Sequence, residues 1–255
     1  MCSAPSTANV SRQTPVSEPV PPDGEAPAVV IPAYAASATL PGVLARLRAA
    51  VPEALAIVVD DGSPDGTAAA AERCGAVVVR QAANLGKGRA LAAGLETALA
   101  RRAVLVVTMD ADGQHPPESV PALLAPLREG RADLVVGSRR REGSAMPWPR
   151  RLTNWLSTSL VARATGPAVT DSQSGFRAFT RAVAEAVRPR GARYDFETEF
   201  LFLAAEAGFR IAAVPVPTVY AGARSHFRHG GDTLRLSTVF LRHWRPILRG
   251  GPRVP

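Results

Sequence analysis

Two aspartates and a glutamine near the middle of the sequence are suited to hold a divalent cation. The segment VTMDADGQHPP (107–117) places Asp110, Asp112 and Gln114 directly after a run of apolar residues. Carboxylate and amide oxygens are the hard ligands that Mg²⁺ and Mn²⁺ prefer, and a diphosphate can complete the coordination shell. A metal held there would neutralise the charge that grows on a departing diphosphate. We therefore expect a metal site for Mg²⁺ or Mn²⁺, and the alternative is a solvated turn.

A second acidic pair lies in VVDDGSPDGT (58–67). At the end of a strand, Asp60 or Asp61 can accept a hydrogen bond from an N–H group of a nucleobase. The alternative is a plain turn through Pro-Asp-Gly that leads into a helix. The turn alone does not explain why the aspartate is doubled, so both residues are candidates for binding a nucleotide.

The only lysine of the chain stands in NLGKGRALAAG (84–94), at the expected start of a helix. Backbone N–H groups at a helix N-terminus, together with the ammonium of Lys87, favour an anion such as a diphosphate. The spacing of Gly86 and Gly88 is not that of a P-loop. Lys87 and Gly88 are thus expected to bind the phosphates of a nucleotide.

The elements that must position these residues alternate between strand and helix. Short apolar runs at 28–31, 56–60, 76–80, 103–110 and 133–139 predict strands, and patterns at 40–51 and 86–100 predict helices. Such alternation predicts an α/β fold with a mostly parallel central sheet flanked by helices. In these sheets ligands bind at the carboxyl ends of the strands. Three polar clusters follow strands and are expected to converge there: Asp60–Asp61, Asp110 with Asp112, and Ser138–Arg139.

The second half of the chain is less regular. We predict a helix over 147–164, a polar DSQSGFRAF segment (171–179) and a helix that bears Glu197 and Glu199. The expected organisation is a tail at 1–26 rich in Pro and Ser, a domain at 27–245 and a C-terminal tail at 246–255. Within the domain, 27–138 would hold the nucleotide and 139–245 the acceptor.

Composition limits the classes of function. The chain has 255 residues, of which 46% are hydrophobic, and a net charge of +8. The charge suits phosphates or anionic lipids, but without interleaved aromatic residues we expect no binding of nucleic acid. Two distant cysteines indicate neither a disulfide framework nor a zinc site, which suits the cytoplasm. No apolar run approaches the roughly 20 residues of a membrane-spanning helix.

The basic stretch 221–255 has two open interpretations. On a helical wheel, apolar and basic residues separate onto opposite sides; these are Leu236, Phe240, Trp244 and Ile247, against Arg235, Arg242 and Arg249. The pattern is typical of an amphipathic helix on a membrane surface. A helix that docks on the sheet and exposes its basic face would show the same pattern. The first interpretation predicts a peripheral protein on the inner face of the cell membrane.

Taken in order, the motifs resemble those of family 2 glycosyltransferases. IPAY, VVDDGSPDGT, NLGKG, MDADGQHPP, GSR, DSQSGFR and FETE follow one another between residues 27 and 241. The chain is most similar to the dolichyl- or polyprenyl-phosphate mannose or glucose synthases. The resemblance implies a GT-A fold, a GDP- or UDP-sugar donor, a polyprenyl phosphate as acceptor and inversion at the sugar.

The resemblance also implies roles for single residues. Pro32, Tyr34 and Asp61 would contact the nucleoside, and Arg139 of GSR would face a phosphate of the donor or acceptor. Of the two FETE carboxylates, Glu199 is the closer match to the family's residue. The family usually has an Asn-Glu pair where this chain has Ala35 and Ala36.

The nature of the acceptor decides what else is needed. A lipid phosphate is already an anion and needs only placement and charge shielding, for which Arg139, Arg177 and Arg224 are candidates. A hydroxyl acceptor needs a carboxylate base, which Glu197, Glu199 or Asp171 could supply. Ser174, in the same motif as Arg177, is a further candidate for binding the acceptor. The alternative for Arg177 and Glu199 is a structural ion pair.

Two other functions fit part of the pattern. A nucleotidyltransferase shares the sheet and the acidic metal pair, but it would have a glycine-rich loop after the first strand, where IPAYAASATLP has no glycine. An inactive subunit that binds a nucleotide-sugar would fit Ala35 and Ala36. The retained Asp110, Asp112 and Gln114 favour turnover.

Overall fold

The computed structural model describes residues 26–139, 159, 161–163, 169, 171–191, 195–217 and 242, with the side chain of Arg139 excepted. Several expectations therefore lie outside the described residues. These are the tail before residue 26, most of the helix predicted over 147–164, the side chains of Arg139 and Arg224, the basic stretch 221–255 except Arg242, and with it the C-terminal tail at 246–255.

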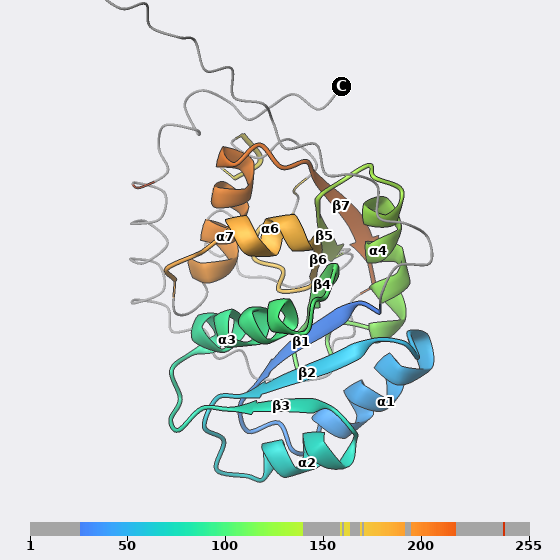
Figure 1. The fold of residues 1–255 in the computed structure, drawn as a ribbon, viewed down its shortest axis with the longest axis vertical. Coiled ribbons are helices and arrows are strands. Elements are labelled where there is room, and N and C mark those ends of the chain that lie inside the picture. Colours follow the sequence, from blue (N-terminus) through green and yellow to red (C-terminus); the bar gives the residue numbers. More distant parts are fainter. Residues whose placement is uncertain are drawn as a thin grey trace, which may run out of the picture.

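One seven-stranded sheet forms the centre of the described fold, in the order β3-β2-β1-β4-β6-β5-β7 (Figure 1). Its strands are β1 (Ala28–Ala33), β2 (Leu55–Asp60), β3 (Val77–Arg80), β4 (Leu105–Thr108), β5 (Leu134–Arg139), β6 (Arg177–Thr180) and β7 (Ile211–Val216). Only β6 is antiparallel to its neighbours in this sheet. The five strands predicted from the apolar runs are confirmed, whereas β6 and β7 were not predicted.

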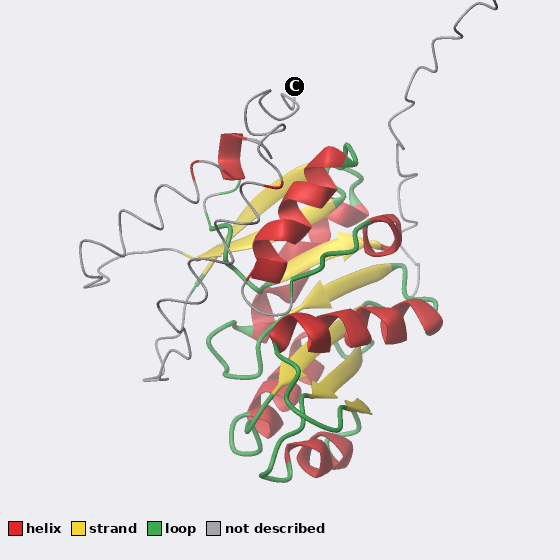
Figure 2. Ribbon diagram, turned by 90° about the vertical axis from the view of Figure 1, so that its left-hand side faces the viewer, coloured by secondary structure: helices red, strands yellow, loops and turns green. Residues whose placement is uncertain are grey.

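Helices cover both faces of the sheet (Figures 1 and 2). On one face lie α3 (Lys87–Ala100), α6 (Arg181–Ala186) and α7 (Asp195–Glu206), and on the other lie α1 (Leu40–Ala50), α2 (Thr67–Arg73) and α4 (Val120–Arg128). A short 3₁₀ helix, η1 (Pro117–Ser119), precedes α4. Val30 packs on the α3 side while Val29 and Ile31 pack on the α1 side, as the period of two in a strand requires. No helix in the described ranges is both long enough and apolar enough to cross a bilayer.

A glycine fixes how closely α3 lies on the sheet. A Cβ atom at Gly94 would stand 2.2 Å from Cγ1 of Val30 in β1, a distance that atoms cannot occupy. The helix therefore rests directly on β1. This contact sets the position at which the N-terminus of α3, with Lys87, reaches the carboxyl edge of the sheet.

The reversed direction of β6 brings the DSQSGFR segment to the same edge. Since β6 is antiparallel, its beginning lies where the parallel strands end, and Arg177 pairs with Thr108 of β4. The hydroxyl of Thr108 donates to the carbonyl of Gly175 at 2.8 Å. Residues 171–177 therefore face the MDADGQ turn that follows β4.

Candidate active site

Lys87 joins two carboxylates at the carboxyl edge of the sheet. Its Nζ lies 2.6 Å from Oδ1 of Asp110 and 2.9 Å from Oε1 of Glu197. The Lys87 and Asp110 side chains are 24% and 27% exposed, whereas that of Glu197 is 3% exposed. The three residues come from α3, the end of β4 and α7, so the site unites both halves of the chain.

The two carboxylates control the protonation of the lysine. Burial by itself would lower the pKa of Lys87, but the negative charges of Asp110 and Glu197 outweigh it and hold the pKa well above its ordinary value. The ammonium therefore stays charged at neutral pH, and the cluster presents a permanent cation next to the acidic turn.

Asp61 fixes the loop that leads into α3, which begins at Lys87. Its Oδ1 accepts from the backbone N–H of Leu85 at 2.7 Å, and its Oδ2 accepts from that of Gly86 at 2.9 Å. The loop passes so close to Gly62 that a Cβ there would lie 2.6 Å from the backbone of Ala83, and Gly62 also has a φ of +70°. The doubled aspartate thus has a structural use, which is to place the start of α3.

Asp60, the first of the pair, is used within its own turn. Its Oδ1 accepts from the backbone N–H of Ser63 at 3.0 Å, and the side chain is buried. The next turn is tied back to β1, because Ser63 Oγ accepts from Ala35 N–H and Thr67 Oγ1 accepts from Ala36 N–H. Ala35 and Ala36 therefore contribute backbone groups that brace the edge of the sheet.

Two large apolar side chains remain exposed beside these turns. Tyr34, directly after β1, is 51% exposed, and Leu85, in the loop before α3, is 55% exposed. Pro32 is half-buried within β1. The exposed side chains provide an apolar surface of the kind on which a nucleobase could rest.

A histidine side chain contacts the backbone of the MDADGQ turn. Nδ1 of His115 lies 3.4 Å from the backbone nitrogen of Asp110, which donates to it, and the imidazole stacks on Phe176 with centroids 5.1 Å apart. Asp112 is exposed, and its Oδ1 accepts from the backbone N–H of Gln114 at 2.9 Å. The histidine thus fixes the first aspartate while the second points to solvent.

The residues of this turn fit a divalent metal ion that shares its shell with a ligand. Asp110, Asp112 and Gln114 are hard oxygen donors on one short turn. A Cβ at Gly175 would lie 2.7 Å from Lys87 Nζ and 3.1 Å from Asp110 Oδ1, so the glycine leaves room against these groups. In the described part of the chain no three His, Cys, Asp or Glu side chains form a closed metal cluster. A metal here would take its remaining ligands from outside these side chains, such as water or the oxygens of a bound diphosphate.

The guanidinium of Arg177 donates hydrogen bonds to backbone carbonyls rather than to a carboxylate. It donates to the carbonyls of Ser174 at 2.9 Å, Glu197 at 2.6 Å and Ser172 at 2.9 Å, and its side chain is buried. Burial lowers its pKa to about 10, although Glu197, Asp171 and Asp110 act in the opposite direction, so it remains charged at neutral pH. Arg177 therefore ties the DSQSGFR segment to α7.

The other two candidates in that segment are also buried. The hydroxyl of Ser174 accepts from Phe176 N–H at 3.3 Å, and the backbone carbonyl of Asp171 accepts from Ser174 N–H at 3.2 Å. The negative charge of Asp171 acts against the lowering of the Arg177 pKa by burial. Both residues shape the segment that faces Asp110.

The two FETE carboxylates point in different directions. Residues two apart on a helix are separated by about 200° around its axis. Glu197 faces Lys87, and its Oε2 is buried without a hydrogen-bond partner among the described residues. Glu199 instead accepts from the backbone N–H groups of Arg190 and Gly191, at 2.7 and 2.8 Å, and from Arg242 at 3.0 Å. The structure thus brings Glu197, not Glu199, to the acidic turn.

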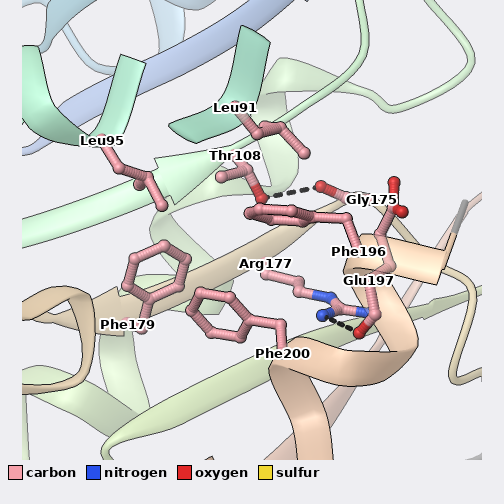
Figure 3. A pocket seen from close by; sticks show the side chains of 9 residues that line it. All are labelled: Leu91, Leu95, Thr108, Gly175, Arg177, Phe179, Phe196, Glu197 and Phe200. Carbon is pink, nitrogen blue, oxygen red and sulfur yellow. Dashed lines mark hydrogen bonds between the residues drawn. The ribbon is translucent and has the colours of Figure 1, made fainter. Parts of the chain in front are cut away.

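A small pocket opens beside Glu197 and Arg177 (Figure 3). One end is polar, with Thr108, Gly175, Arg177 and Glu197, and the rest is apolar. The apolar lining consists of Leu91, Leu95, Phe179, Phe196 and Phe200. Side chains of both α3 and α7 line the pocket, which includes Glu197 of the charged cluster.

Sequence reasoning identified most members of this site but not how they pair. Lys87, Asp110 and Glu197 were each predicted, yet the ion pairs between them were not. Gly175 was not singled out, although its position inside the DSQSGFR motif was a usable signal. The ion pair between Arg177 and Glu199 is not present, because each has the other partners described above.

Comparisons with known proteins identify the family. A model of the family described as "Glycosyl transferase family 2" matches residues 28–188. Undecaprenyl-phosphate mannosyltransferase of Micrococcus luteus is 39% identical over 203 residues, which cover 74% of this chain and 82% of that protein. Polyprenol monophosphomannose synthase of Mycolicibacterium smegmatis is 34% identical over 202 residues, covering 74% and 75%.

A solved structure is similar over most of its length. Glucosyl-3-phosphoglycerate synthase from Mycobacterium tuberculosis, in complex with Mg²⁺ and uridine diphosphate, superposes with a TM-score of 0.68 at 25% identity. The match covers 86% of this chain and 79% of that one. The similarity extends over both halves of the expected domain.

Proposed function

Because the chain belongs to glycosyl transferase family 2, we propose that it transfers a sugar from a GDP- or UDP-sugar to a lipid-type acceptor, a polyprenyl phosphate. The family, the GT-A fold and glycosyltransferase activity, all expected from the motifs, are confirmed by the family match and the solved neighbours. The donor, the metal and the acceptor are our proposal. The observation that carries it is the cluster of Lys87, Asp110 and Glu197 at the carboxyl edge of the sheet.

The donor would lie across the ends of β1 to β4. We assign the nucleoside to the surface beside Tyr34 and Pro32, over the turns that Asp60 and Asp61 hold. The diphosphate would lie at the N-terminus of α3, where Lys87, Gly88 and the helix dipole favour an anion. The uridine diphosphate bound by the mycobacterial neighbour supports this class of donor.

We assign a Mg²⁺ or Mn²⁺ ion to Asp110, Asp112 and Gln114. When bound, the ion would offset the negative charge that builds up on the diphosphate as the sugar leaves. Asp112 is exposed and directed outward, so it can reach an ion without breaking an internal contact other than that to Gln114. The Mg²⁺ in the mycobacterial neighbour supports this use of a metal.

The transfer needs one bond to form and one to break. An oxygen of the acceptor attacks the anomeric carbon from the side opposite the diphosphate. The bond from that carbon to the diphosphate breaks, its electron pair stays on the diphosphate, and the sugar inverts. Lys87 stabilises the leaving group because its charge is fixed and already in place.

A phosphate acceptor suits the chemistry of the site. It attacks as an anion, so no proton has to be removed, and placement is the main requirement. We assign the acceptor to the DSQSGFR side, with Arg139 and Arg224 as its shielding cations and with Asp171, Ser174 and Arg177 shaping the segment. The two relatives named for undecaprenyl-phosphate and polyprenol transfer support a lipid phosphate.

A hydroxyl acceptor is the second candidate, and one observation favours it. The carboxylate of Glu197 is buried, and its Oε2 lacks a hydrogen-bond partner among the described residues, as a general base would before substrate binds. We assign this role to Glu197 rather than to Glu199, whose oxygens are already engaged. With a lipid phosphate, Glu197 would only hold Lys87.

A lipid acceptor places the reaction at a membrane surface. We propose that the protein is cytoplasmic and peripheral, and that its basic C-terminal stretch approaches the inner face of the cell membrane. Neither nucleotidyl transfer nor an inactive subunit is needed to account for the cluster.

The experiment is a donor and acceptor panel. Purified protein is incubated with Mn²⁺ and GDP- or UDP-sugars, with polyprenyl phosphate, the matching prenol or no acceptor, and labelled sugar in the organic phase is counted. We expect transfer to the phosphate. Transfer to the prenol alone would establish the hydroxyl candidate, and no consumption of any donor would refute the proposal.

Chelation and one variant serve as controls in the same assay. EDTA should stop transfer and added Mn²⁺ should restore it. Asp112→Asn should lose transfer while keeping its melting temperature, because its side chain is exposed and packs against little. Undiminished transfer in EDTA would remove the metal assignment.

A further inference from the structure

A buried carboxylate on α7 is shared between two distant parts of the chain. Glu199 is 2% exposed. Its Oε2 accepts from the N–H groups of Arg190 and Gly191, in the loop before the helix, and its Oε1 lies 3.0 Å from Nη1 of Arg242. The loop, the helix and Arg242 therefore meet at one side chain.

The loop is packed tightly against the first turn of α7. A Cβ at Gly191 would lie 2.5 Å from the backbone nitrogen of Phe196 and 2.8 Å from its Cα. These are backbone atoms that cannot move aside without moving the helix. The position of the first turn thus depends on the loop, and the loop is held to the helix by Glu199.

The same turn carries the carboxylate of the active site. Glu197 contacts Lys87 through its side chain and Arg177 through its carbonyl. Glu197 and Glu199 project about 200° apart around the helix axis. The contact of Glu197 with Lys87 and that of Glu199 with Arg242 therefore hold α7 on different sides. A rotation of α7 that followed the loss of one contact would displace the other.

We propose that Arg242 is a positioning residue for the transfer reaction: through Glu199 it fixes the first turns of α7, and so the place of Glu197 against Lys87. The inference rests on the proposed function for its activity readout. It assigns Arg242, whose side chain is 52% exposed, to a contact within the protein and not to lipid headgroups. The cation also neutralises a buried carboxylate whose other oxygen has only backbone donors.

The test combines kinetics with a double-mutant cycle. Arg242→Gln should lower kcat roughly tenfold and leave KM for the donor unchanged. A displaced Glu197 would shift Lys87, which stabilises the leaving group, and a misplacement of about 1 Å costs up to about 100-fold in rate. Arg242→Lys should recover most of the loss because the contact is a single N–O pair. Glu199→Gln should match Arg242→Gln, and the double variant should be no worse than either.

A matched control removes an exposed ion pair elsewhere. Arg46→Gln breaks the ion pair between Arg46 and Glu118, whose side chains are 41% and 55% exposed respectively. We expect kcat of this variant to be unchanged. Additive losses in the Arg242→Gln, Glu199→Gln double variant would overturn the proposal. So would reduced binding of Arg242→Gln to anionic phosphatidylglycerol vesicles with kcat intact, which would instead assign Arg242 to the membrane.

Amide hydrogen exchange separates this inference from the proposed function. Arg242→Gln should exchange faster at residues 190–200 than the unaltered protein, whatever the substrate proves to be. Unchanged exchange there would refute the positioning role even if the enzyme transfers sugar. Faster exchange in a protein that consumes no donor would keep the positioning role and refute only the function.

Discussion

Replacing Gly175 by alanine should separate activity from stability. The glycine lies within the DSQSGFR segment, its φ lies outside the left-handed region, and its carbonyl accepts from Thr108. The three atoms nearest to a new Cβ would be Lys87 Nζ at 2.7 Å and the two carboxylate oxygens of Asp110 at 3.1 and 3.3 Å. The methyl group therefore presses first on the charged cluster.

The size of the effect follows from these distances. Nonbonded atoms approach best at about 3.5 Å or more, so the ammonium has to move by roughly 0.8 Å. A lysine end is flexible and moves cheaply, while alanine lowers the entropy of the unfolded chain by about 0.4–1 kcal/mol. A displacement near 1 Å at the reacting groups costs up to about 100-fold in rate, or about 2.7 kcal/mol in the barrier.

Two other glycines provide matched comparisons. Gly42 is exposed in α1 with nothing within 4 Å of a new Cβ, so Gly42→Ala should stabilise the protein and leave kcat unchanged. Gly94→Ala should destabilise it, because its Cβ would meet Val30 in the core. Melting temperature and kcat are measured for all three.

The expected result is a melting temperature for Gly175→Ala within a few degrees of the unaltered protein and a kcat about 100-fold lower. A variant with full activity would refute the role given to the pair of Lys87 and Asp110. A large loss of stability would show that Gly175 serves the fold instead.

Three further predictions concern the charged cluster. Asp112→Asn should weaken Mn²⁺-dependent binding of nucleoside diphosphate at least tenfold, as measured by calorimetry, with its metal-independent binding unchanged; equal Mn²⁺ dependence would contradict the assignment. Glu197→Gln should lower kcat far more with a prenol acceptor, where a base is needed, than with a prenyl phosphate. Equal losses with the two acceptors would refute the role of Glu197 as a general base. Because the pKa of Lys87 is raised above 10.5, its contribution to stability is complete below that value and is lost only as pH rises above it. The difference in unfolding free energy between the unaltered protein and Lys87→Met should therefore be flat from about pH 6 to about pH 9, and a slope there would refute the raised pKa.

The first half of the fold was predicted well from the sequence because three of its strands, β1, β2 and β4, are largely buried. Runs such as AVVI and AIVVD are continuous and apolar, so they could be located without knowing their neighbours. β6 was missed because RAFT is four residues long and follows a polar segment. Its antiparallel direction depends on pairing with β4 and β5, which no local pattern reports.

The site could be predicted as a set of residues but not as a set of contacts. Lys87, Asp110 and Glu197 each stood in a recognisable motif, yet Lys87 and Glu197 lie 110 residues apart in the sequence. Motif matching favoured Glu199 over Glu197, and only the rotation of α7 distinguishes which of them faces Lys87. The backbone role of Asp61 depends on a loop 24 residues away and was likewise hidden.

The most direct test is a crystal of the protein soaked with Mn²⁺ and a nucleoside diphosphate, with the metal located by anomalous scattering. We predict one manganese ion between the MDADGQ turn and the diphosphate, within about 2.3 Å of an oxygen of Asp112. The phosphates should lie at the N-terminus of α3. Manganese bound elsewhere, or a diphosphate remote from Lys87 and the acidic turn, would contradict the account.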